Sequence, residues 1–275
     1  MFIPRYTCRS SISNKESLII GIGDGWTEGM GNYCPQAVER FIKREIDFKT
    51  VTAQSRESFY FKDSWPNLVA TELDWDAVNI GISGLSNPGM AKKLINEFDL
   101  DTSIDFSRYN KVTVLVMLTD PARVSFYSNE RLVSYTPFSK EPGIKPVYEC
   151  FLEHVYLHNS DKILETRHAL RSIELYCKSK NFNMFFMSAF TSIDYLKPFY
   201  DSPNNIHNYI DKPCMGQFLV NPKLFRSIAS GFTEKELNNY LIEKDTLDWG
   251  ICGHPGPRGY AKIAKVIASF LKERH

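Results

Sequence analysis

The chain has 275 residues, of which 43% are hydrophobic and 24% are charged, and its formal net charge is +1. This length and this apolar content suffice for a large buried core and argue against disorder. The near balance of charge excludes the strong positive field of nucleic-acid and membrane-surface binders, so we expect neither nucleic acid nor a membrane as a partner.

Apolar runs predict the strands. Each is rich in β-branched or aromatic residues and lacks the alternation of a half-exposed strand, which is typical of a parallel sheet covered on both faces. The four clear runs are 17–23, 76–82, 111–118 and 182–190, and 48–53 is a weaker fifth candidate.

Helical patterns lie between and after these runs. Pro35 is suited to the first turn of a helix over 35–46, and Ser64 is a candidate cap for a helix over 64–73. Further helices are predicted within 145–180, over 233–244 and over 256–274. Strands alternating with helices imply a three-layer α/β/α sandwich with a parallel sheet of about five strands.

The whole chain, 1–275, is predicted to be a single domain with two insertions. Residues 121–146 and 197–231 are rich in Pro, Asn, Ser and aromatic residues and do not fit a minimal sandwich. Both follow strands, where open α/β sheets bind ligands, so we expect these insertions to shape a substrate cleft.

Cysteine usage and hydropathy indicate the compartment. The six cysteines are scattered and form no CxxC pair, which favours reduced thiols and disfavours a structural zinc site. The sequence shows no signal-peptide pattern and no run of about eighteen apolar residues. We therefore expect a cytoplasmic protein, in the host cytoplasm if it is viral.

The segment "LIIGIGDGWTEGMGN", residues 18–32, suggests a strand that runs into an active-site loop. A dinucleotide-binding GxGxxG fingerprint fails because Trp26 stands at its third glycine position. A P-loop fails because no Gly-Lys-Ser/Thr follows, and the GxSxG elbow of α/β-hydrolases is also absent.

Four segments in the right order resemble the SGNH, or GDSL-type, hydrolase family. Gly23–Gly29 is similar to the family's first block, Gly-Asp-Ser-x-Thr-x-Gly, after the first strand. Residues 64–90, with Asn79, Gly81, Ser83 and Gly84, resemble the second block, 114–123 occupy the third, and 253–264, with His254-Pro255, resemble the last. The residues of the second and third blocks most resemble a divergent branch of the family that is common among bacteriophage proteins.

The resemblance implies a specific chemistry at position 25. In the family, the first-block serine attacks an acyl carbonyl, a C-terminal histidine takes its proton, and an upstream aspartate orients that histidine. Carried over to this chain, His254 is the base, and the backbone N–H groups of Gly25 and Gly84 are oxyanion donors. The third-block donor falls on Thr119, where the family has asparagine.

This chain departs from the family at several of these positions. Gly25 replaces the serine and has no oxygen with which to attack. Ile251 and Cys252 stand where the family often has the aspartate, so Asp248 is the nearest candidate orienter. Three explanations stay open: an engineered replacement of serine, a natural loss that leaves a binding protein, or a different nucleophile such as Ser83 or a water activated by His254.

The remaining candidate residues surround the same loop. Asp24 is a catalytic-site candidate that can also brace the loop through backbone N–H groups. Trp26, Ser83, Asn87 and Arg123 are candidates for binding substrate. Arg123 could contact an anionic group or form a surface salt bridge, and Ser83 is more simply a turn residue than a nucleophile.

No metal and no organic cofactor is implied. The helically spaced set His154, His158, Asp161, Glu165 and His168 is better explained as a solvated polar stripe than as a metal site.

The expected function is an esterase-like hydrolase or acyl-transfer enzyme acting on an O-acyl group of a small or carbohydrate-like substrate. Gly25 would leave it inactive or silenced. The alternatives are a catalytically silent ligand-binding protein on the same scaffold and a structural or interaction protein of a virus particle.

Overall fold

The computed structural model contains a five-stranded sheet whose strand order is β1-β3-β2-β4-β7. The model describes residues 9–13, 15–100, 104–128, 131–135, 159–190, 196, 199, 201–210, 212, 214–219 and 254–274. The strands are β1 (Arg9–Ser11), β2 (Ser17–Gly23), β3 (Asp76–Asn79), β4 (Lys111–Leu118) and β7 (Asn183–Ser188). Strands β3, β2, β4 and β7 pair in parallel, whereas β1 pairs antiparallel with β3 at one edge.

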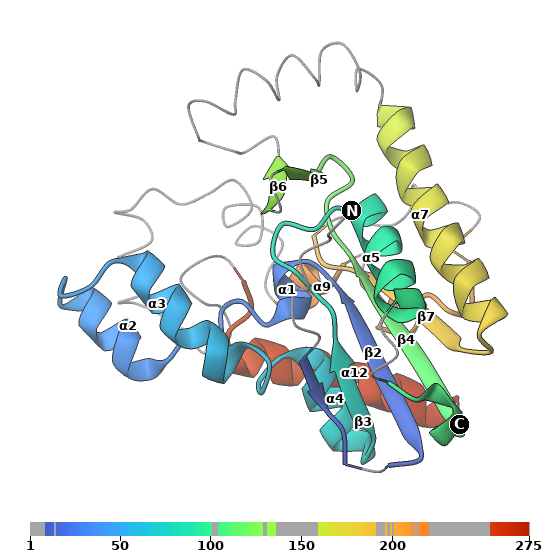
Figure 1. Cartoon of the computed structure of the whole chain (residues 1–275), viewed down its shortest axis with the longest axis horizontal. Coiled ribbons are helices and arrows are strands. Elements are labelled where there is room, and N and C mark those ends of the chain that lie inside the picture. Colours follow the sequence, from blue (N-terminus) through green and yellow to red (C-terminus); the bar gives the residue numbers. More distant parts are fainter. Residues whose placement is uncertain are drawn as a thin grey trace.

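Helices cover both faces of this sheet (Figure 1). On one face, α5 (Asn87–Leu100) and α7 (Asn159–Ser179) pack over Ile20, Val114 and their neighbours. On the other face, α4 (Trp65–Leu73) and α12 (Pro257–Glu273) pack over Ile19, Leu115 and their neighbours. Successive strand residues therefore enter opposite cores, which explains why the strands read as continuous apolar runs. The predicted α/β/α sandwich is confirmed.

The remaining elements are short and lie outside the two helical layers. They are α1 (Gly25–Glu28), α2 (Pro35–Ile42), α3 (Phe48–Ser55), a π-helix over Arg56–Tyr60, a 3₁₀ turn over Phe106–Arg108, α8 (His207–Ile210) and α9 (Met215–Leu219). Tyr33, Ala37, Val51 and Tyr60 form a small separate core beneath α2 and α3.

Three details differ from the sequence-based predictions. The weak strand candidate at 48–53 is wrong, because these residues form α3, whose first turn is capped by Asp47 accepting from the N–H of Thr50 at 2.8 Å. Helix α5 was not predicted. The edge strand β1 was not predicted either, so the sheet contains four parallel strands and one antiparallel strand.

The first insertion contains a hairpin of β5 (Val124–Ser128) and β6 (Arg131–Tyr135). Residues 129–130 and 136–146 of this insertion, residues 220–231 of the second insertion and the predicted helix over 233–244 lie outside the described residues. Within the described part of the chain, none of the helices combines the length and apolarity that a membrane span requires.

Candidate functional site

A one-turn helix follows β2 directly and carries the first-block motif. Asp24 is the N-cap of α1, and its Oδ1 accepts a hydrogen bond from the N–H of Trp26 at 3.1 Å. Gly29 ends the helix in the left-handed conformation, with φ of 97°. The four residues of α1 are buried, so this turn is held rigidly at the carboxyl end of the sheet.

Gly25, His254 and Ser83 meet at one point. A β-carbon built on Gly25 would lie 2.7 Å from Nε2 of His254 and 3.2 Å from Oγ of Ser83. These residues come from α1, from the segment before α12 and from the turn between β3 and α5. The fold thus brings together three residues that the sequence places in the first, last and second blocks.

The imidazole of His254 occupies space that a side chain at position 25 would need. Real β-carbons essentially never approach another heavy atom as closely as 2.7 Å. A serine at this position therefore requires the His254 ring to move back. Because the obstructing atom is the far end of a side chain, a small rotation of the ring suffices.

Two contacts hold the His254 segment against the α1 loop. Gly31 has φ of 112°, and a β-carbon there would lie only 2.3 Å from the carbonyl oxygen of Pro255. The hydroxyl of Tyr260, in the first turn of α12, donates to the carbonyl of Met30 at 2.7 Å. The glycine-rich stretch after α1 is thus explained by the close approach of the chain's carboxyl-terminal segment.

Glu28 fixes the position of Ser83, and sequence reasoning gave it no role. One carboxylate oxygen of Glu28 accepts from the backbone N–H of Ser83 at 2.7 Å. The other accepts from Nε and Nη2 of Arg56 at 2.8 and 2.7 Å. Glu28 is only 7% exposed, so this bridge orders the Ser83 turn from below. The sequence signal that could have indicated a role for Glu28 is its position within the first block, Gly23–Gly29.

The turn after β3 has further internal support. Gly84 has φ of 85°, a conformation that favours glycine. The side chain of Asn79 donates to the carbonyl of Thr27 at 2.6 Å and accepts from the N–H of Gly81 at 2.9 Å. The Asn-x-Gly part of the second block is therefore a clamp between β3 and α1. The hydroxyl of Ser83 is exposed and lies 3.4 Å from the sulfur of Met30.

Asp24 is fully buried, and both of its carboxylate oxygens accept hydrogen bonds, two of them from the predicted site residues Thr119 and Arg123. Its Oδ2 accepts from Oγ1 of Thr119 at 2.8 Å and from Nη1 of Arg123 at 2.9 Å. A hydroxyl carries one proton, and that of Thr119 is already donated to Asp24, so Thr119 is not an oxyanion donor in this arrangement. The guanidinium of Arg123, which also lines a neighbouring groove, pairs with Asp24 through Nη1.

Two of the predicted substrate-binding residues are structural. Asn87 is 1% exposed, and its amide accepts from the N–H of Thr119 at 2.9 Å and donates to the Thr119 carbonyl at 3.1 Å. Trp26 is fully buried, with its ring centroid 4.9 Å from that of Phe190 in an edge-to-face contact. Both side chains are enclosed by the protein, and these contacts give each of them a structural role.

Asp248, Ile251 and Cys252 lie outside the described residues, as do His154 and His158. The assignment of Asp248 as the orienter of His254 thus remains a prediction. Among the described residues, no group of three or more His, Cys, Asp or Glu side chains is arranged to hold a metal ion.

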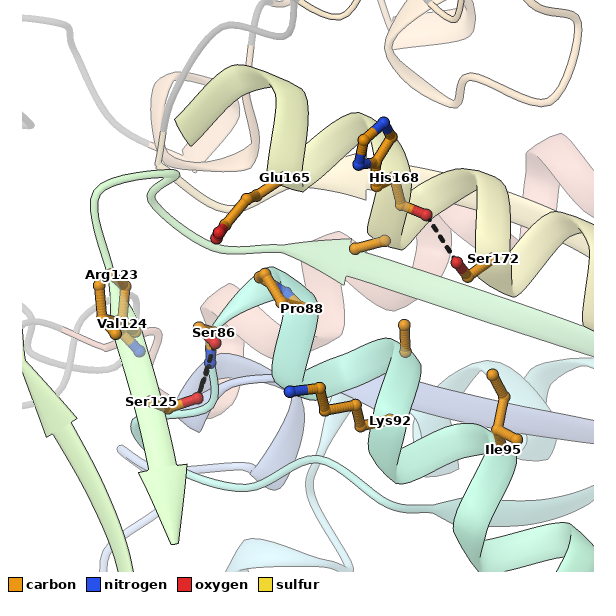
Figure 2. Close-up of a pocket in the computed structure, with 12 residues that line it drawn as sticks. Ser86, Pro88, Lys92, Ile95, Arg123, Val124, Ser125, Glu165, His168 and Ser172 are labelled. Atoms are coloured by element: carbon orange, nitrogen blue, oxygen red, sulfur yellow. Dashed lines mark hydrogen bonds between the residues drawn. The ribbon is translucent and has the colours of Figure 1, made fainter. Parts of the chain in front are cut away.

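A groove of about 450 Å³ lies beside this site, between α5 and α7 (Figure 2). Ser86 and Arg123 line it, but Gly25, Ser83 and His254 do not. The groove is therefore separate from the point where Gly25 meets His254. Ser83 lies at that point, and Ser86, from the same turn, lines the groove.

The comparisons with known proteins give only distant similarities. No protein-family model matches the sequence, and no curated protein matches it either. Among solved structures, the chain is similar to one described as a lipolytic protein of the G-D-S-L family from Desulfitobacterium hafniense DCB-2. The identity is 11% and the TM-score 0.42, over 92% of this chain and 98% of that one.

Two further solved structures are esterases. One is a carbohydrate esterase described as having an active site with divergent catalytic and non-catalytic binding functions (14% identity, TM-score 0.47, 96% of this chain and 67% of that one). The other is an acetyl xylan esterase from the rumen bacterium Butyrivibrio proteoclasticus (14% identity, TM-score 0.44, 94% of this chain and 64% of that one). Similarity at this level does not establish what this chain does.

Proposed function

We propose that the protein has the site of an SGNH-type ester hydrolase or acyl-transfer enzyme from which the nucleophile is missing. Its substrate class is an O-acyl ester of a small or carbohydrate-like molecule. The observation that carries the proposal is the 2.7 Å between Nε2 of His254 and the position of a β-carbon on Gly25. This proximity supports the proposal, because His254 lies beside the residue position at which the family has its attacking serine.

Acyl transfer needs an oxygen nucleophile, a base within hydrogen-bond reach and donors for the oxyanion. His254 supplies the base in this proposal, and the backbone N–H groups of Gly25 and Gly84 are the candidate donors. Asp248 is the candidate orienter of the imidazole. Without an oxygen on residue 25, the chain should turn esters over slowly or not at all.

The test is to restore the missing group. Gly25→Ser should create turnover of p-nitrophenyl acetate once the His254 ring rotates away, because the new hydroxyl then has its base. Adding His254→Ala should abolish the gain, and adding Asp248→Asn should reduce it. Gly25→Ala is the matched control, since it adds the same β-carbon without the hydroxyl. Circular dichroism establishes that each variant is folded.

The residual rate gives the scale of the expected gain. Related sites that lack a catalytic triad member keep roughly 10³–10⁴-fold catalysis over water, supplied by the oxyanion hole and binding. The unmodified chain should therefore be at or below that level. A folded Gly25→Ser variant with no gain would contradict the silenced-hydrolase proposal and favour a ligand-binding protein on this scaffold.

A second candidate mechanism uses Ser83 as the nucleophile. It is favoured by the exposed Ser83 hydroxyl, which lies 3.2 Å from the same point that His254 approaches. In that case the unmodified chain has esterase activity and reacts covalently with a fluorophosphonate. Ser83→Ala should abolish both properties, whereas Ser86→Ala should leave the labelling site unchanged. Labelling at any residue other than Ser83 would contradict this mechanism.

A further inference from the structure

The turn between β3 and α5 leaves one backbone donor unused. Within the described part of the chain, every backbone N–H from 81 to 86 donates a hydrogen bond except that of Gly84. The N–H of Leu85 closes the turn on the carbonyl of Ile82 at 3.0 Å, and the positive φ of Gly84 suits the third position of a type II turn. A donor left over in an otherwise fully paired turn is available to a bound group.

Glu28 ties this donor to the helix that carries the other candidate oxyanion donor. Gly25, which supplies that second N–H, is the first residue of α1, and Glu28 is the last residue of the same helix. Oε2 of Glu28 accepts from the N–H of Ser83, the residue before Gly84, at 2.7 Å. Two donors stabilise one oxyanion only if they converge on one oxygen atom. The hydrogen bond from Ser83 to Glu28 therefore constrains the geometry on which the donor pair depends.

Asn79 supports the base of the same turn independently of Glu28. Its side chain donates to the carbonyl of Thr27 at 2.6 Å and accepts from the N–H of Gly81 at 2.9 Å. These two hydrogen bonds do not involve Glu28. A substitution of Glu28 should therefore loosen the peptide between Ser83 and Gly84 without detaching the whole turn from α1.

The negative charge of Glu28 needs compensation, because it lies one residue away from the Gly84 donor. The Glu28 side chain is only 8% exposed, so water screens its charge poorly. Nε and Nη2 of Arg56, the first residue of the π-helix, donate to Oε1 of Glu28 at 2.8 and 2.7 Å. The guanidinium thus neutralises the carboxylate on the side away from Ser83. The paired carboxylate can hold the Ser83 N–H without repelling a negative charge that forms beside it.

We propose that Glu28 and Arg56 are positioning residues for the oxyanion donors of the acyl-transfer site. Glu28 holds the Ser83–Gly84 peptide so that the Gly84 N–H acts together with that of Gly25, and Arg56 keeps the charge of Glu28 from opposing the oxyanion. This inference rests on the proposed function, to whose site it adds two residues. Because the oxyanion exists only in the transition state and the intermediate, both residues should affect kcat more than KM.

Hydrolysis of p-nitrophenyl acetate by Gly25→Ser tests the role of the charge. Adding Arg56→Gln should lower kcat at least about tenfold with little change in KM, because it leaves the carboxylate charge beside the oxyanion uncompensated. Adding Glu28→Gln as a third change should restore most of the loss, because an amide at position 28 still accepts from the Ser83 N–H but carries no charge. If Arg56 merely braced Glu28, the third change would restore nothing.

Arg40→Gln is the matched control for Arg56→Gln. Arg40 pairs with Glu45 at 3.3 Å, and both side chains are 50% exposed. The change removes the same charge from an exposed ion pair that has no contact with the Ser83 turn. In the Gly25→Ser background it should leave kcat within about twofold.

Amide hydrogen exchange in the unmodified chain tests the role of Glu28 without turnover. Glu28→Ala should raise the exchange rate of the Ser83 amide at least about tenfold, because it removes the only acceptor that this N–H has among the described residues. The Gly81 amide, which donates to Asn79, should exchange at an unchanged rate and reports that the turn is still attached. Circular dichroism establishes that each variant is folded.

The outcomes separate this inference from the proposed function. Unchanged exchange at Ser83 in Glu28→Ala would overturn the role of Glu28. No loss of kcat with Arg56→Gln, or a loss that Glu28→Gln does not restore, would overturn the role of Arg56. Either result leaves an active Gly25→Ser variant and the hydrolase proposal intact. If Gly25→Ser gains no activity, the hydrolase proposal fails, and faster exchange at Ser83 then supports Glu28 as the residue that orders this turn in a ligand-binding site.

Discussion

Asp24 and Gly25 are neighbours in the same one-turn helix, yet their surroundings differ completely. Asp24 is buried, and its two carboxylate oxygens accept hydrogen bonds from Trp26, Thr119 and Arg123. Gly25 has no side chain, and the space beside it is approached by a histidine ring and a serine hydroxyl from elsewhere in the chain. Asp24 has its partners inside the protein, whereas in the proposed function Gly25 stands where a serine would complete the site.

The difference indicates which part of the Gly-Asp-x motif the fold requires. Asp24 ties α1 to the end of β4 and to the turn that follows β4, so its role is architectural whatever occupies position 25. In the proposed function, the next position, Gly25, is the one that serves the chemistry. Changes at Asp24 should therefore be measured as stability, and changes at Gly25 as activity.

The largest expected effect on stability comes from Asp24→Ala. This change leaves the guanidinium of Arg123, which is 17% exposed, without its carboxylate. Breaking a buried ion pair by removing one partner typically costs about 3–5 kcal/mol of unfolding free energy. Urea unfolding of the purified variant measures this loss.

Glu72→Ala is the matched control for that change. Glu72 pairs with Lys272 at 3.0 Å, but both side chains are 54% exposed. An exposed pair contributes about 0–1 kcal/mol, so this variant should be close to the unmodified chain. Equal losses of unfolding free energy for Asp24→Ala and Glu72→Ala would contradict the structural role of Asp24, and with it the contrast between Asp24 and Gly25.

His207 provides a second, pH-dependent test of the architectural side. It lies beside the end of β7, and its Nε2 accepts a hydrogen bond from the N–H of Ser188 at 2.7 Å. Burial lowers the pKa of His207 from 6.5 to about 4, because the charged ring is poorly solvated there. Between about pH 6.5 and 4, the His207 imidazole is therefore protonated in the unfolded chain but neutral in the folded chain.

Stability should consequently fall as the pH drops through that window. The contribution of His207 is fully present above about pH 6.5 and is lost toward pH 4, with a total of up to about 3 kcal/mol. His207→Gln keeps a hydrogen-bond acceptor and does not titrate, so the difference between the two pH profiles of unfolding free energy isolates this group. Parallel profiles would show that His207 is not protonated on unfolding.

Gly31→Ala is expected to have the next largest effect. Gly31 has a positive φ, and a β-carbon there meets the Pro255 backbone at 2.3 Å, where no side-chain rotation can relieve the contact. We expect a loss of about 2–3 kcal/mol from backbone strain and overpacking. Thermal unfolding measures it, and an unchanged melting temperature would mean that the 254–255 segment is not held against this loop.

Much of the fold could be predicted from the sequence, because the central strands are buried on both faces. Runs such as 17–23 and 111–118 are mostly apolar and coincide with β2 and β4. The strand prediction for 48–53 was wrong because short β-branched runs are compatible with a strand or a helix. The N-cap at Asp47 favours the helix. Helix α5 begins with Asn-Pro-Gly, which is typical of a turn, so no helix was predicted there.

The candidate site was only partly predictable. The order of the sequence blocks predicted that Gly25, Ser83 and His254 belong to one site, and the fold brings them together. The burial of Trp26 and Asn87 could not be predicted, because a motif gives residue types and spacing but not burial. The hydrogen bond by which Thr119 donates its single proton to Asp24 could not be predicted either, because it joins residues 95 positions apart.

The smallest expected effect on stability is that of Gly25→Ala, and it is the sharpest contrast with Gly31→Ala. Both glycines touch the 254–255 segment, but Gly25 has a helical backbone, and its β-carbon meets only side-chain atoms, those of the His254 ring and the Ser83 hydroxyl. Glycine in a helix is about 0.5–1 kcal/mol less favourable than alanine, which offsets the cost of moving the ring. We therefore expect Gly25→Ala to lie within about 1 kcal/mol of the unmodified chain in urea unfolding. A loss as large as that of Gly31→Ala would mean that His254 is fixed in place and that a serine cannot be accommodated beside it. The site at Gly25 would then not be that of a silenced hydrolase.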